Sequence, residues 1–127
     1  MLARLAALPF LITAQLVAQQ SVVTPLLSKD LPECPGKEAV VLTVDLPPGS
    51  SGTVHRHNAH VFVYVVQGSI VMQVKGGQPV TLGVGQTFYE NPDDIHTVGR
   101  NASKTRPAKF VVFFVKNKGV PPVLPAQ

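Results

Sequence analysis

Residues 49–68 of the chain read GSSGTVHRHNAHVFVYVVQG, and this stretch decides the fold. It follows two prolines, which cannot donate a backbone hydrogen bond and therefore end the apolar run before them. The run VFVYVV at 61–66 consists of valine and aromatic residues, which favour strands. Glycine at both ends of the stretch suits tight turns. We therefore predict two successive strands here, with histidines on the first.

Further segments of the same kind fill the chain as far as residue 116. They are short and are separated by Gly, Pro, Asn or Asp. Together with the two strands above, they lie at 38–46, 53–57, 61–66, 69–75, 79–82, 86–90, 95–100 and 108–116. Many short strands joined by regularly spaced turns are typical of an antiparallel sandwich or a small barrel. The sequence therefore predicts one all-β domain.

Two of these segments, VFVYVV (61–66) and FVVFFV (110–115), are apolar on both faces of the pleat. A strand with one face in water alternates polar and apolar residues, because successive side chains point to opposite faces. We therefore expect one face to line the barrel interior and the other to meet a second sheet or a partner subunit. This pattern predicts a homodimer.

The net charge of +4 narrows the range of partners only slightly. Basic residues crowd the C-terminal third of the chain, but they have no interleaved aromatic platform and no basic helix. The sequence therefore predicts no nucleic-acid binding, and a solvated surface is the simpler interpretation. Attraction of a small anionic ligand stays open.

The N-terminus, MLARLAALPFLITAQLVAQQ, resembles a secretory signal peptide. A single positive residue, Arg4, precedes an apolar run that ends near Val17, which is shorter than the ~20 residues of a membrane-spanning helix. We expect a signal peptide at 1–18 and export to the periplasm or the medium, with no stable membrane span. An ordinary N-terminal helix in a cytoplasmic protein, or an uncleaved anchor, is the alternative. The remaining chain divides into an irregular lead-in at 19–37, the β domain at 38–118 and an extended tail at 119–127.

Three of the four histidines lie within six residues, and the fourth, His96, stands alone near a later turn. His55 and His57 project from the same face of a strand, because residues i and i+2 point the same way. Two such imidazoles can take adjacent positions on one metal ion, and His96 is the candidate for the third. Imidazole suits Fe, Mn, Ni, Cu or Zn. The alternative is that these are surface or hydrogen-bonded core histidines.

At this point the chain resembles the cupin family, whose first motif is G-x5-H-x-H-x3,4-E-x6-G and whose second is G-x5-P-x-G-x2-H-x3-N. Gly49, His55, His57 and Gly68 match the first motif, and GQTFYENPDDIHTVGRN (85–101) matches the second through its first Gly and its His. The resemblance covers roughly residues 38–118. It implies a double-stranded β-helix, the cupin jelly-roll barrel, with one divalent transition metal ion in its mouth.

The chain departs from both motifs. Val61 stands where the family has its ligand glutamate, and His60, one residue earlier, is a candidate for a fourth ligand. In the second motif Asn91 and Asp93 replace Pro and Gly, and Arg100 takes the position of Asn. We therefore expect a site without a carboxylate ligand, which would leave the metal charge near +2 and provide no base among the metal's own ligands.

Cupins with three histidine ligands include dioxygenases, so the resemblance implies a mononuclear metal-dependent dioxygenase-type oxidoreductase acting on a small molecule. A non-catalytic module that binds or senses a small ligand is the alternative. Catalytic residues stay unassigned. Glu90, Asp93 and Asp94 could orient an imidazole or act as a base, although Asn-Pro-Asp-Asp also makes a good turn without any function.

Overall fold

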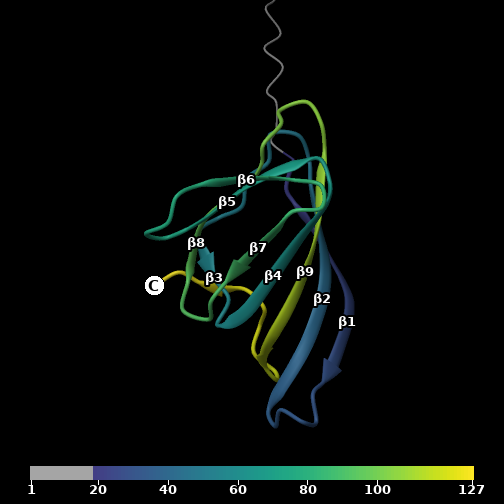
Figure 1. Cartoon of the computed structure of the whole chain (residues 1–127), viewed down its shortest axis with the longest axis vertical. Coiled ribbons are helices and arrows are strands. Elements are labelled where there is room, and N and C mark those ends of the chain that lie inside the picture. The colour runs from purple at the N-terminus through teal and green to yellow at the C-terminus, as the bar shows by residue number, and fades with distance from the viewer. Residues whose placement is uncertain (1–18) are drawn as a thin grey trace, which may run out of the picture.

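The computed structural model describes residues 19–127, which form ten β-strands and no helix (Figure 1). The strands are β1 (Val22–Asp30), β2 (Lys37–Leu46), β3 (His55–Arg56), β4 (Ala59–Gln67), β5 (Ser69–Val74), β6 (Val80–Gly83), β7 (Thr87–Glu90), β8 (Ile95–Asn101), β9 (Ala108–Asn117) and β10 (Leu124–Pro125). Within the described residues, no helix has the length and hydropathy that a membrane span requires. The signal peptide predicted at 1–18 lies outside the described residues.

The strands make two five-stranded sheets, in the orders β1-β2-β9-β4-β7 and β10-β3-β8-β5-β6. Every pairing is antiparallel, and strands that are distant in sequence are neighbours in both sheets, as in a jelly roll. One core joins the two sheets, since buried side chains of β4 and β9 pack with those of β5. The predicted all-β class is therefore confirmed.

The alternation along β4 and β9 shows which faces are covered. Val61, Val63 and Val65 are at most 3% exposed and lie in the core, while the intervening Phe62 and Tyr64 are 46% and 49% exposed. On the outer face Phe62 contacts Tyr89 and Phe113, with ring centroids 5.1 and 5.9 Å apart. The inner face is thus covered by the fold itself. The outer face is open in the single chain, so the homodimer stays a prediction.

The lead-in at 19–37 is more regular than the sequence suggested. Val22–Asp30 forms β1, which pairs with β2 at the edge of the first sheet and is exposed along its whole length. Pro25 lies at an irregularity in that pairing. An edge strand tolerates a proline at such a bulge because no neighbour needs the missing N–H. A proline-containing segment with no buried face therefore gave no strand signal in the sequence.

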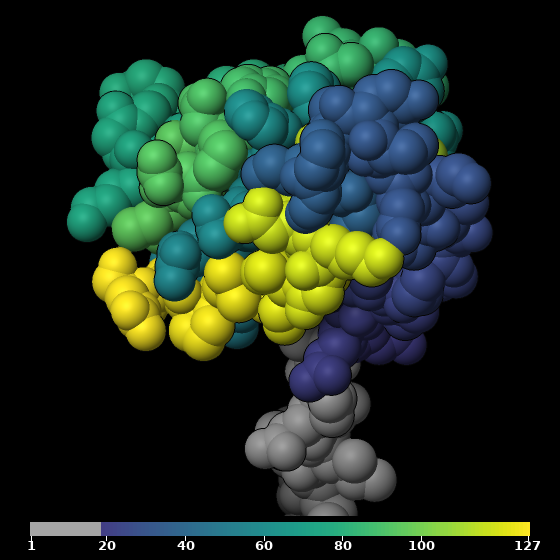
Figure 2. Space-filling view, turned by 90° about the horizontal axis from the view of Figure 1, so that it is seen from below, coloured from purple at the N-terminus to yellow at the C-terminus, as the bar shows by residue number. Residues whose placement is uncertain are grey.

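The C-terminal tail returns across the barrel mouth. Lys116, which is 4% exposed, contacts the Glu38 carboxylate and the carbonyl oxygen of Val120 through Nζ. Beyond that point β10 pairs with β3, so that Leu124 lies opposite Arg56. Figure 2 shows the yellow C-terminal residues beside the teal segment that carries β3. The tail predicted to be extended therefore lies against the strand that begins the histidine cluster.

Candidate metal centre

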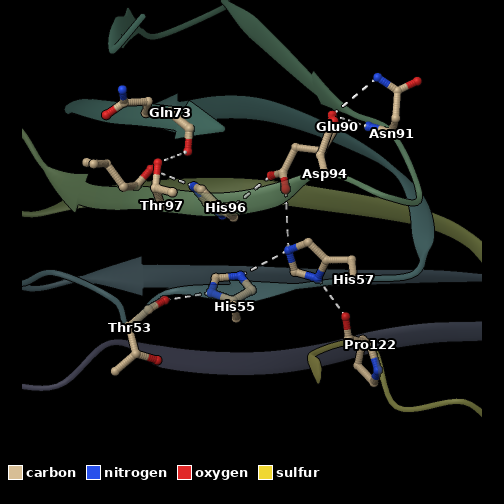
Figure 3. Close-up of polar contacts among 11 residues, drawn as sticks. Thr53, His55, His57, Gln73, Glu90, Asn91, Asp94, His96, Thr97 and Pro122 are labelled. Carbon is tan, nitrogen blue, oxygen red and sulfur yellow. Dashed lines mark hydrogen bonds and ion pairs between the residues drawn. The ribbon is translucent and has the colours of Figure 1, made fainter. Parts of the chain in front are cut away.

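Three of the predicted ligand residues meet at one end of the barrel interior (Figure 3). His55 on β3 lies directly opposite His96 on β8 in the antiparallel pairing, and such partners project side by side. His57 follows β3 and projects to the same side as His55, with ring centroids 4.6 Å apart. One ring nitrogen from each of the three histidines lies within 4.8 Å of the others. The predicted convergence of a strand pair with a distant third histidine is therefore present.

Hydrogen bonds to backbone carbonyls set the tautomer of each ring. The bonds run from His55 Nδ1 to Thr53 O (2.7 Å), from His57 Nδ1 to Pro122 O (2.6 Å) and from His96 Nε2 to Val98 O (2.6 Å). A carbonyl oxygen can only accept, so each of these nitrogens carries the hydrogen. The remaining nitrogens, His55 Nε2, His57 Nε2 and His96 Nδ1, are therefore left with bare lone pairs. This is how the outer partners of a metal-binding histidine orient it.

The bare nitrogens of His55 and His57 are close enough to share a cation. His55 Nε2 and His57 Nε2 lie 3.0 Å apart, and with both hydrogens on Nδ1 neither can donate to the other. Two ligand atoms at about 2.1 Å from one ion, at octahedral or tetrahedral angles, are separated by about 3.0–3.4 Å. The spacing of the two nitrogens fits a pair of ligands on one metal ion, which would remove their mutual repulsion.

Glu90, at the end of β7, projects into the same cluster. Its Oε2 lies 3.7 Å from His57 Nε2 and its Oε1 lies 3.5 Å from His96 Nδ1 (Figure 3). The residue is 1% exposed, and both Glu90 Oε2 and His96 Nδ1 are buried without a hydrogen-bond partner among the described residues. An orphaned buried polar atom costs about 1–3 kcal/mol, and more if it is charged. The unpaired atoms therefore fit a bound cation.

Burial sets the protonation of these groups in the metal-free protein. Desolvation lowers the pKa of His57 from 6.5 to about 4 and does the same to the pKa of His96, with neighbouring histidines adding to both shifts. Desolvation raises the pKa of Glu90 from 4.5 to about 7, and Asp94 adds to the rise. The two buried histidines are therefore neutral near pH 7, which is the form that binds a metal ion.

A cavity of about 240 Å³ opens beside the cluster. Apolar side chains make most of its wall, among them Leu42, Val61, Val63, Met72, Phe110, Val112 and Phe114. The exposed Val23 of β1 and Val123 of the tail also border it. A cavity of this size suits a ligand of few heavy atoms, with its polar end at the histidines.

The other sequence candidates lie elsewhere. His60 points to the outer face of β4, where its Nδ1 lies 2.6 Å from Tyr89 Oη, and the structure does not bring it to the other three histidines. Ala59 takes the inward position before it, being 2% exposed. Asp94 accepts hydrogen bonds from the backbone and side chain of Asn91, so it serves the turn, and Asp93 is exposed.

Of the three acidic residues that the sequence offered near His96, Glu90 is the one whose carboxylate lies beside the histidines. The sequence did hold a signal: in QTFYE (86–90), Glu90 is in phase with Phe88, which packs against the core. Strand alternation therefore turns the carboxylate inward. What the sequence did not show is the pairing that places Glu90 opposite Val61.

Comparison with known proteins identifies the family and the fold. The family model for the cupin domain matches residues 42–114. The Cupin_2 domain of an XRE family transcriptional regulator from Enterobacter cloacae is 30% identical, with a TM-score of 0.57 over 76% of this chain and 96% of that one. An oxalate oxidase in complex with the substrate analogue glycolate is 26% identical, with a TM-score of 0.62 over 82% of this chain, which spans 54% of the oxidase.

A protein from Klebsiella pneumoniae with a double-stranded β-helix domain is 17% identical and has a TM-score of 0.66 over 84% of this chain and 86% of that one. At this identity the likeness shows the fold alone. A search of curated proteins found no match. The family match and the paired sheets confirm the predicted double-stranded β-helix, and the chain belongs to the cupin family.

Proposed function

We propose that the chain holds one divalent transition metal ion on His55, His57 and His96, and that it is a metal-dependent oxidoreductase of the dioxygenase type acting on a small molecule. The observation that carries this proposal is the convergence of three bare imidazole nitrogens beside an apolar cavity. A bound ion of this class supplies Lewis acidity and, for Fe, Mn or Cu, one-electron chemistry with O₂.

The surrounding residues prepare the site for that ion and a substrate. The backbone carbonyls of Thr53, Pro122 and Val98 hold the rings so that their lone pairs converge, at no entropic cost when the ion binds. The apolar wall keeps bulk water away from the reacting end of the substrate. Three histidines leave coordination positions on the ion open for a substrate, as a catalytic site requires. A structural site, by contrast, has all of its positions filled by protein ligands.

Among the relatives, the oxalate oxidase supports oxidoreductase chemistry rather than a particular substrate. Oxalate oxidase binds the small carboxylate glycolate, and the chain's net charge of +4 is compatible with a small anion. The cavity of about 240 Å³ favours a small substrate. Small carboxylates, thiols and diketones with a short apolar part are therefore the first compounds to test.

The test is a metal analysis followed by an oxygen assay. Purified protein is loaded with Fe²⁺, Mn²⁺, Cu²⁺, Ni²⁺ or Zn²⁺, its metal content is measured, and O₂ consumption is followed with the panel of small molecules. We expect near-stoichiometric metal that is lost in His57→Ala, and turnover in the parent alone. A parent that takes up none of these metals would refute the proposal.

The alternative function is a non-catalytic module that binds or senses a small ligand. The specific observation in its favour is that a 30% identical relative is a domain of a transcriptional regulator. Metal-loaded protein that is stabilised by a small ligand against heat, yet turns over no compound of the panel, would support this alternative over the enzyme.

We propose that the outer aromatic patch, consisting of Phe62, Tyr64, Tyr89 and Phe113, is covered by a second copy of the chain, since these large side chains are 37–49% exposed on one face. Light scattering should give a dimer mass, and Phe62→Ser with Phe113→Ser should give a monomer.

We also propose that residues 1–18 direct export of the protein. Cell fractionation of the protein with and without these residues tests this proposal.

A further inference from the structure

We infer that Glu90 is the fourth protein ligand of the metal, so that this chain supplies from β7 the carboxylate that its family places on β4. This inference rests on the metal site proposed above. It assigns a ligand that the motif comparison excluded, because the motif position itself is occupied by Val61.

The strand register makes the two positions equivalent. Val61 of β4 and Glu90 of β7 are direct partners in the antiparallel pairing. Such partners point to the same face of the sheet, with Cβ atoms about 4.5–5.5 Å apart. Both residues are 1% exposed, and both line the cavity beside the histidines. A glutamate at either position therefore projects its carboxylate to the same end of the barrel.

The distances fit a ligand better than a distant base. Glu90 oxygens lie 3.7 Å from His57 Nε2 and 3.5 Å from His96 Nδ1, and these two nitrogens are the ligand atoms of their rings. The separations are only slightly longer than the about 3.0–3.4 Å between neighbouring ligands on one ion. An ion between the three groups would draw them together by a few tenths of an ångström.

Nothing else in the described residues balances this carboxylate. No lysine or arginine forms an ion pair with Glu90, and Oε2 accepts no hydrogen bond. The nearby Asp94 is an acid and is itself engaged by Asn91. A buried carboxylate is retained in proteins when it is paired or when it coordinates a metal. Here the facing groups are the lone pairs of two imidazoles, which an ionised carboxylate cannot pair with and which a shared cation would satisfy.

A carboxylate ligand changes what the centre attracts. It cancels one unit of the charge of a divalent ion, so the site carries about +1 rather than about +2. An anionic substrate is then attracted by a net charge of about +1 instead of about +2. A neutral substrate of similar shape therefore competes with it more strongly. The chain thus has a three-histidine, one-carboxylate set in spite of its motif.

The experiment compares metal binding in four proteins: the parent, Glu90→Gln, the exchange variant Val61→Glu with Glu90→Val, and the control Asp93→Asn. The control removes an exposed carboxylate from the same turn and leaves the site untouched. Co²⁺ is the probe, because its visible absorption spectrum reports the coordination sphere and its affinity follows from competition with a chelator. Circular dichroism of the metal-free proteins checks that each variant is folded.

We expect Glu90→Gln to bind Co²⁺ at least about 10–100-fold more weakly than the parent and with an altered spectrum. Asp93→Asn should match the parent, and the exchange variant, if it folds, should regain most of the lost affinity. A Glu90→Gln protein with the parent's affinity and spectrum overturns the inference while leaving the three-histidine site intact. A parent that binds no Co²⁺ overturns the metal site and this inference together.

Discussion

The C-terminal tail holds the proposed metal ligand His57 in place, and its removal should weaken metal binding without dismantling the barrel. The tail's contribution is the carbonyl of Pro122, which accepts the His57 Nδ1 hydrogen at 2.6 Å. A chain that ends at Val120 loses this acceptor together with β10 and the rim residue Val123. It keeps the carbonyl of Val120 that anchors Lys116.

The magnitude follows from the role of the lost contact. Removing an outer partner of a ligating histidine costs about 10–100-fold in metal affinity, which is about 1.4–2.7 kcal/mol. The metal-free chain loses the same His57–Pro122 bond, the β10–β3 pairing and the exposed bond between Arg56 Nε and Pro125 O, each such bond contributing about 0.5–1.5 kcal/mol. The free energy of unfolding should therefore fall as well, and it is measured separately from the metal affinity.

The assay is a Co²⁺ or Zn²⁺ competition titration on the full chain, on the chain that ends at Val120 and on a control that ends at Pro125. The control removes only residues 126 and 127, which lie beyond β10. Urea denaturation of the metal-free proteins gives the unfolding free energies. If the chain ending at Val120 binds as tightly as the full chain, the tail does not position His57 and the reasoning fails.

Three other perturbations test the centre and its support. Gly99→Ala would place a Cβ 2.9 Å from His96 Cε1, so the imidazole ring must move. We expect at least about tenfold weaker metal binding as a result. Gly52→Ala is the control, because its Cβ would meet its nearest atom at 3.5 Å, and it should bind the metal as the parent does. In the metal-free protein the pKa of Glu90 is raised from 4.5 to about 7. Between these two pH values the folded state keeps a proton that the unfolded state loses. The contribution of Glu90 to the free energy of unfolding therefore falls as the pH rises from 4.5 to about 7. Urea titrations should show that the unfolding free energy of Glu90→Gln, relative to that of the parent, rises by up to about 3 kcal/mol between about pH 4.5 and pH 7. A difference between the two proteins that does not change with pH would contradict the burial argument. Asn101→Ala removes the side-chain amide that donates to the carbonyl oxygens of Leu46, Pro47 and Arg106, of which Pro47 O keeps Ser50 as a donor. It should lower the free energy of unfolding by about 2–3 kcal/mol, measured by urea denaturation, and a loss below about 0.5 kcal/mol would show that these bonds are not needed.

The sequence by itself determined the features that depend on local periodicity. The pleat of VFVYVV puts Val61, Val63 and Val65 on one face and Phe62 and Tyr64 on the other, and the structure buries the valine face. The same rule predicts that His55 and His57 share a face. These predictions hold because the direction of a side chain on a strand is fixed by its neighbours in the chain, whatever the strand packs against.

Only the tertiary structure decided which distant residues complete the centre. Glu90 stands beside the histidines because β7 pairs with β4 in one register, and a shift of one residue would turn its carboxylate outward. Pro122 is 65 residues from His57 in sequence, and its contribution is a backbone carbonyl, which has no signature in the side-chain pattern. Strand register and the path of the tail depend on the packing of the whole barrel, so no local stretch of sequence could show them.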